Sequence, residues 1–133
     1  MSREGETYAT AVGCMDGKVV IPVTNYAREK FGVRFVDFPD YAGAVGELAR
    51  DLPNPEAEAL LKREIQISLD KHNSQGIVVH GHAECAGNPV DDEQHKKDVI
   101  KAAQRIREME PGVPVVPVFV ERAEPEWVIS ELG

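Results

Sequence analysis

The chain has 133 residues and a formal net charge of -8, and this length corresponds to a single domain over residues 1–133. The acidic charge argues against a nucleic acid or an anionic membrane surface as partner, because either requires a basic patch. Two cysteines are too few for a disulfide scaffold. With no signal peptide and no apolar run of membrane-spanning length, we expect a cytoplasmic protein whose thiols stay free.

Apolar runs alternate with amphipathic segments along the chain, which predicts strands separated by helices. In chain order we expect a strand over residues 8–14, a helix over 22–31, a strand over 33–38, a helical turn or two within 40–51, a helix over 54–73, a strand over 76–80, a helix over 91–109, a strand over 113–120 and a short helix over 125–132. Pro22 suits the first turn of its helix. Pro114 and Pro117 place the last strand at a sheet edge.

Long crossovers between these strands indicate a parallel sheet. The predicted fold class is therefore α/β, with three layers around a mostly parallel four-stranded central sheet in the strand order 2-1-3-4. In such a sheet the carboxyl ends of the strands meet at one edge, and open α/β sheets place their functional sites there.

Soft metal ligands follow two of the predicted strands. His82 and Cys85 are three residues apart in a glycine-flanked loop after the third strand, and Cys14 follows the first strand at a glycine. Because neighbouring parallel strands end at the same edge, we expect Cys14, His82 and Cys85 to meet there. Two thiolates and one imidazole are a ligand set for Zn²⁺ that leaves a fourth position open.

Two short motifs carry a family resemblance. The sequence CMDGK at residues 14–18 and the sequence HAEC at residues 82–85 resemble the two signatures of the β-class carbonic anhydrases, Cys-x-Asp-x-Arg and His-x-x-Cys. The resemblance implies a β-carbonic-anhydrase-like core and zinc held by Cys14, His82 and Cys85. The chain looks like a short, divergent member of that family.

The resemblance also implies roles for two further residues, our candidate catalytic residues. Asp16 is the carboxylate beside the fourth position of the metal, and Lys18 is the cation paired with it. Lys18 stands where the family has Arg, which keeps the charge but loses the planar guanidinium fork. Asp16 either accepts a hydrogen bond from the zinc-bound hydroxide or binds the metal directly, and the sequence leaves this open.

The activity that the resemblance implies is that of a zinc lyase of the carbonic anhydrase type. Zinc-bound hydroxide would attack carbon dioxide, in exchange with bicarbonate, or a related small electrophile. The resemblance and the apolar tail around Trp127 predict a homodimer or a higher homo-oligomer. One alternative is a non-catalytic zinc-binding domain of the same fold. Another is a redox protein in which Cys14 and Cys85 form a metal-free dithiol.

Other polar residues near the motifs receive plainer interpretations. We expect His80 to lie on the face opposite His82 or in the sheet interior, either as a packing residue or behind the ligands, and His72 to be structural at the end of its helix. His95 has lysine neighbours and is predicted to lie on a solvated helix face. Glu84 is either a proton acceptor or an exposed loop carboxylate.

Overall fold

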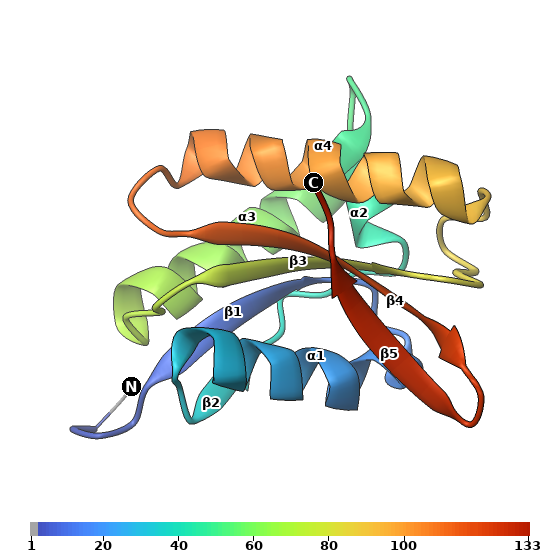
Figure 1. The fold of residues 1–133 in the computed structure, drawn as a ribbon. Coiled ribbons are helices and arrows are strands. Elements are labelled where there is room, and N and C mark those ends of the chain that lie inside the picture. The colour runs from blue at the N-terminus through green and yellow to red at the C-terminus, as the bar shows by residue number, and fades with distance from the viewer. Residues whose placement is uncertain (1–2) are drawn as a thin grey trace.

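The computed structural model describes residues 3–133, in which strands and helices alternate for most of the chain (Figure 1). The elements are β1 (Tyr8–Gly13), α1 (Gly17–Phe31), β2 (Phe35–Asp37), α2 (Ala44–Ala49), α3 (Pro55–Lys71), β3 (Ile77–His82), α4 (Asp92–Met109), β4 (Val115–Ala123) and β5 (Glu126–Glu131). In the part of the chain described, no helix combines the length and the apolar character needed to cross a membrane.

All five strands belong to one sheet in the order β2-β1-β3-β4-β5. The first four pair in parallel, and β5 pairs antiparallel to β4. The α/β fold class and the order 2-1-3-4 predicted from the sequence are confirmed. The predicted number of four strands is wrong, because the sheet continues into β5.

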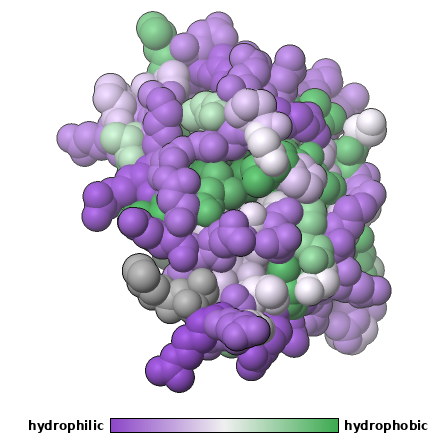
Figure 2. Space-filling model, turned by 90° about the vertical axis from the view of Figure 1, so that its left-hand side faces the viewer, coloured by the Kyte–Doolittle hydropathy of each residue, from purple (hydrophilic) through white to green (hydrophobic). Residues whose placement is uncertain are grey.

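The sheet lies between two helical layers, as the three-layer prediction requires (Figure 1). On one face α1 buries Val19, Val23 and Ala27 against the sheet, and α2, α3 and α4 cover the other face. In the space-filling view, hydrophobic residues gather in a band between two hydrophilic surfaces (Figure 2). Successive side chains of the central strands point alternately into the two cores. Both faces of these strands are therefore buried, which explains why their sequences are almost continuously apolar.

The helices start where side chains cap their first free N–H groups. Asn54 accepts from the N–H groups of Glu56 and Ala57 at the start of α3, and Asp91 accepts from that of Gln94 at the start of α4. Both helices match their predicted ranges closely. α1 begins earlier than predicted, because Asp16 caps it, and Pro22 therefore lies inside the helix and not in its first turn.

The predicted helix over residues 125–132 is wrong, because this tail forms β5. Its apolar side chains at Trp127 and Ile129 alternate with more exposed neighbours, which is the period of a strand. β4 is consequently an inner strand, and the edge predicted from its prolines is also wrong. The Pro117 carbonyl accepts the Leu132 N–H, so the N–H that Pro117 lacks would face Leu132, just past the end of β5, where one missing bond costs little.

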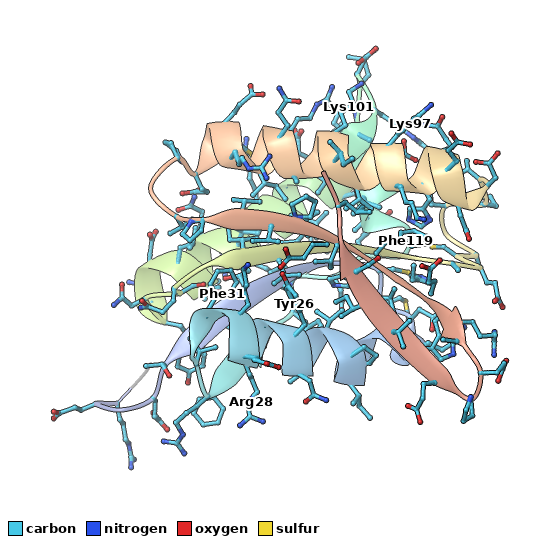
Figure 3. All side chains as sticks on the ribbon, viewed as in Figure 1. Tyr26, Arg28, Phe31, Lys97, Lys101 and Phe119 are labelled. Carbon is cyan, nitrogen blue, oxygen red and sulfur yellow. The ribbon has the colours of Figure 1, made fainter. Side chains whose placement is uncertain are left out.

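Side chains of α1 also fix this tail from below. Tyr26 points from α1 toward the sheet and donates to Glu131 of β5, whereas Arg28 points away from the sheet into solvent (Figure 3). Lys30 adds an ion pair of 3.1 Å to the same Glu131 carboxylate. β5 is thus attached to β4 by strand pairing and to α1 through Glu131.

Candidate metal centre

The structure brings the three candidate metal ligands together at the carboxyl edge of the sheet. Cys14 directly follows β1, His82 is the last residue of β3, and Cys85 lies in the turn after it. β1 and β3 are adjacent parallel strands. One ligand atom from each residue lies within 4.8 Å of the other two, and the two sulfur atoms are 3.8 Å apart.

This geometry fits a tetrahedral metal ion. Two Zn–S bonds of about 2.3 Å at a tetrahedral angle place their sulfur atoms about 3.8 Å apart, as observed. Nδ1 of His82 lies 2.8 Å from the Ala83 carbonyl, so this nitrogen carries the proton and Nε2 presents its lone pair. Nε2 is buried and has no hydrogen-bond partner among residues 3–133. A buried acceptor beside two sulfurs is what a metal ligand requires.

The two thiols are electrostatically coupled. The hydrogen bond from Cys85 lowers the pKa of Cys14, against the effect of burial, and the backbone N–H groups of Gly43 and Asp16 lower it further. The same contact with Cys14, together with burial, raises the pKa of Cys85. Cys85 Sγ donates to Cys14 Sγ, and a cation bound by both thiolates would displace this proton.

Asp16 connects the first motif to the imidazole. Its Oδ1 accepts the backbone N–H of Lys18 at 2.9 Å, and its Oδ2 accepts from Lys18 Nζ at 3.0 Å. The same Oδ2 lies 3.9 Å from His82 Nε2. Burial raises the pKa of Asp16, but the hydrogen bonds from Lys18 outweigh it and the pKa is lowered. The Asp16 side chain is therefore ionised beside the ligand cluster.

The cluster is buried but borders on solvent at one side. Cys14 is 8% exposed, Cys85 6% and His82 0%. The side chains of Asp16 and Lys18 are 22% and 38% exposed. The aspartate–lysine pair is therefore more exposed to solvent than the three candidate ligands.

Two glycines bring a further segment against the site. A Cβ atom on Gly43 would lie 2.2 Å from the carbonyl oxygen of Gly87, and one on Gly87 would lie 2.5 Å from the Gly43 nitrogen. Gly43 also has a φ of 70°, which favours glycine. Through this contact the segment before α2 packs directly on the turn that carries Cys85. The helical turn predicted within residues 40–51 is confirmed as α2, but its packing against the turn that carries Cys85 was not predicted.

Two histidines differ from their predictions. His95 is buried, not solvated: its ring lies 6.1 Å from that of His82 and packs edge-on against Phe119 at 5.5 Å. Its position four residues before Val99 puts it on the buried stripe of α4. His80 was expected to face away from His82. Both belong to β3, however, where residues two apart share a face. The interior packing role holds, because His80 is fully buried and packs edge-on against Phe38 at 6.0 Å.

His72 has the structural role predicted for it, and Glu84 matches one of the two roles predicted for it. His72 lies 2.6 Å from the Asp37 carboxylate and stacks on Tyr8 at 4.0 Å, which is a structural role. Glu84 is an exposed loop carboxylate, paired with Arg122 at 3.1 Å.

Comparison with known proteins points to the same family as the two motifs. The family described as "Putative carbonic anhydrase" matches residues 4–132. Among solved structures, the chain resembles the β-carbonic anhydrase CafA of the fungal pathogen Aspergillus fumigatus, with a TM-score of 0.53 and 13% identity over 96% of this chain and 76% of that one. At this identity the likeness concerns the fold. A comparison with curated proteins gave no match. Because the family match spans nearly the whole chain, the protein belongs to this carbonic anhydrase family.

Proposed function

We propose that the protein is a zinc-dependent lyase of the carbonic anhydrase type, which hydrates carbon dioxide or a related small electrophile. The observation that carries the proposal is the cluster of Cys14, His82 and Cys85 with the Asp16 carboxylate 3.9 Å from His82 Nε2. Two thiolates and one imidazole suit Zn²⁺, and three protein ligands leave one position for substrate chemistry. Free, buried cysteines also suit a reducing cytoplasmic setting.

Zinc bound by these residues would lower the pKa of a water in the fourth position from that of bulk water toward about 7. The chain supplies the groups that use such a nucleophile. Asp16 is ionised, and its carboxylate would accept a hydrogen bond from that oxygen and orient it. Lys18 holds that carboxylate through its ammonium and its N–H. Because Cys14 and Cys85 neutralise a divalent cation, we expect activity to rise toward alkaline pH.

We further propose that the protein works as a homodimer or higher homo-oligomer. Met15, inside the first motif, is 64% exposed, and Ile21, on the first turns of α1, is 71% exposed. Large apolar side chains beside a functional site favour contact with another protein surface. Light scattering at micromolar concentration measures the mass, and a monomer would contradict this part of the proposal.

A second candidate is a zinc-binding domain without catalysis. Two observations favour it: the ligands are almost fully buried, and Lys18 replaces the arginine of the family motif. In that case the ion would stabilise the fold by joining the ends of β1 and β3.

Metal analysis and stopped-flow hydration assays separate these candidates. We expect about one zinc ion per chain and measurable hydration of carbon dioxide, both lost in Cys85→Ser and His82→Gln. His72→Gln is the matched control, since His72 pairs with Asp37 outside the cluster and should keep its zinc. Stoichiometric zinc without hydration at any pH would leave the non-catalytic domain. A wild-type protein without zinc would leave the dithiol.

A further inference from the structure

The hairpin of β4 and β5 extends past the end of the neighbouring strand. β3 ends at His82, which pairs with Val120, whereas β4 continues to Ala123. The last residues of β4 therefore pair with β5 alone, including the cross-strand pair Arg122 and Trp127. Figure 1 shows this hairpin reaching beyond the sheet on the side where α1 begins. It lies next to both motifs of the proposed metal site.

Trp127 contacts the first motif. Lys18 Nζ lies 5.4 Å from the centre of the Trp127 ring while it donates to Asp16 at 3.0 Å. A lysine ammonium is a point charge on a flexible stem, and it has no planar fork to fix its direction. The negative face of an indole attracts such a cation. The ring therefore restricts Lys18 to positions from which it reaches Asp16.

Arg122 contacts the second motif. Its guanidinium lies 4.6 Å from the centre of the Trp127 ring, and its Nε and Nη2 donate to the two carboxylate oxygens of Glu84 at 3.2 and 3.1 Å. Glu84 lies between His82 and Cys85 and has a φ of 61°, a conformation that non-glycine residues rarely adopt. This two-bond contact holds the strained residue in place.

We infer that the C-terminal hairpin is a positioning element of the metal site. Trp127 positions Lys18 on Asp16, and Arg122 positions the turn that carries His82 and Cys85. This inference rests on the proposed function, because it assigns the hairpin to that same site. Neither residue is catalytic, since both act through other side chains. An exposed ion pair alone contributes little, so the shared ring of Trp127 is what joins the two contacts.

A double-mutant cycle on zinc affinity tests the inference. Zinc affinity is measured by chelator competition for the wild type, Trp127→Leu, Lys18→Met and the double variant. We expect each single variant to weaken binding about two- to fivefold, which is the range of a partly exposed cation–π contact. The double variant should be weaker than Lys18→Met only by the part that Trp127 exerts through Arg122, so the two losses should be less than additive. Trp127→Phe keeps an aromatic face and should restore most of the affinity.

The control is Val128→Ala, a neighbour on β5 that is 44% exposed and should bind zinc like the wild type. Unchanged affinity in Trp127→Leu, or additive losses in the double variant, would overturn the inference while leaving the proposed function intact. If Trp127→Leu does not fold, Trp127→Met, which keeps apolar bulk but has no aromatic face, takes its place in the cycle. If the protein does not hydrate carbon dioxide but the losses of Trp127→Leu and Lys18→Met are less than additive, catalysis is refuted and the inference stands. A wild type without zinc affinity would overturn both.

Discussion

The two carboxylate oxygens of Asp16 make different contacts, and substitution can separate the helix cap from the role that we propose at the metal site. Oδ1 caps α1 by accepting the Lys18 N–H, whereas Oδ2 faces Lys18 Nζ and His82 Nε2. An asparagine keeps an oxygen for the cap but has no charge, and an alanine lacks both. We therefore predict that Asp16→Asn keeps the cap and loses only the stability that the ionised carboxylate contributes, whereas Asp16→Ala also loses the cap and is less stable. Both variants should lose activity.

The magnitudes follow from these contacts. Loss of a helix cap to alanine costs about 1 kcal/mol, whereas asparagine caps as well as aspartate. For a chain of this length, 1 kcal/mol corresponds to about 3 to 5 °C in Tm. Loss of the charge beside the metal ligands should lower the hydration rate about 10- to 100-fold in both variants. Thermal unfolding by circular dichroism and stopped-flow hydration measure the two effects independently.

The pH dependence of folding stability gives a separate test of the charge on Asp16. Because the pKa of Asp16 is lowered in the folded state, its ionised form stabilises the fold. This stability is present above the pKa of an unfolded aspartate, about 3.9, and is lost as the pH falls through the folded value. The wild type and Asp16→Asn should therefore converge in stability at low pH. An Asp16→Asn variant as active as the wild type would refute the role at the site, and equal stability of the two variants would refute the cap.

Three further predictions concern the surroundings of the site. Burial lowers the pKa of His80 to about 3. As the pH falls below about 6.5, the unfolded chain therefore binds a proton that the folded chain excludes. His80→Leu should gain more stability in urea unfolding at pH 5 than at pH 8, and equal gains would contradict this. Gly87→Ala would place a Cβ 2.5 Å from the Gly43 nitrogen, which should cost about 1 to 3 kcal/mol and weaken zinc binding in chelator competition; wild-type values would contradict the close packing. In the metal-free protein, peroxide should oxidise Cys14 and Cys85, whose sulfur atoms are 3.8 Å apart, to a disulfide. Thiol counting should show that bound zinc prevents this oxidation. Oxidation at the same rate with zinc would argue against the site.

The parts of the fold that local sequence determines were predictable. α3 and α4 each combine a capping side chain, Asn54 or Asp91, with a buried stripe at helical spacing. The continuous apolar runs of β1 and β3 identified buried parallel strands, but neither run shows that the two strands are neighbours. The juxtaposition of Cys14 with His82 follows once these two strands pair side by side.

The errors arose where one residue carries two signals or where structure depends on a distant partner. Pro22 resembled a first-turn signal, yet Asp16, assigned to chemistry, also caps the helix five residues earlier in the chain than expected. β5 is short and becomes a strand only through pairing with β4. The contacts of Trp127 and Arg122 with the two motifs join segments far apart in sequence, so no local pattern indicates them.

X-ray absorption spectroscopy of the zinc-loaded protein tests the ligand assignment most directly. If Cys14, Cys85 and His82 hold the ion, the spectrum should show two sulfur neighbours at about 2.3 Å and nitrogen or oxygen neighbours at about 2.0 to 2.1 Å. His82→Gln should lose the imidazole signature. A first shell without sulfur, or one with a single sulfur, would contradict the account.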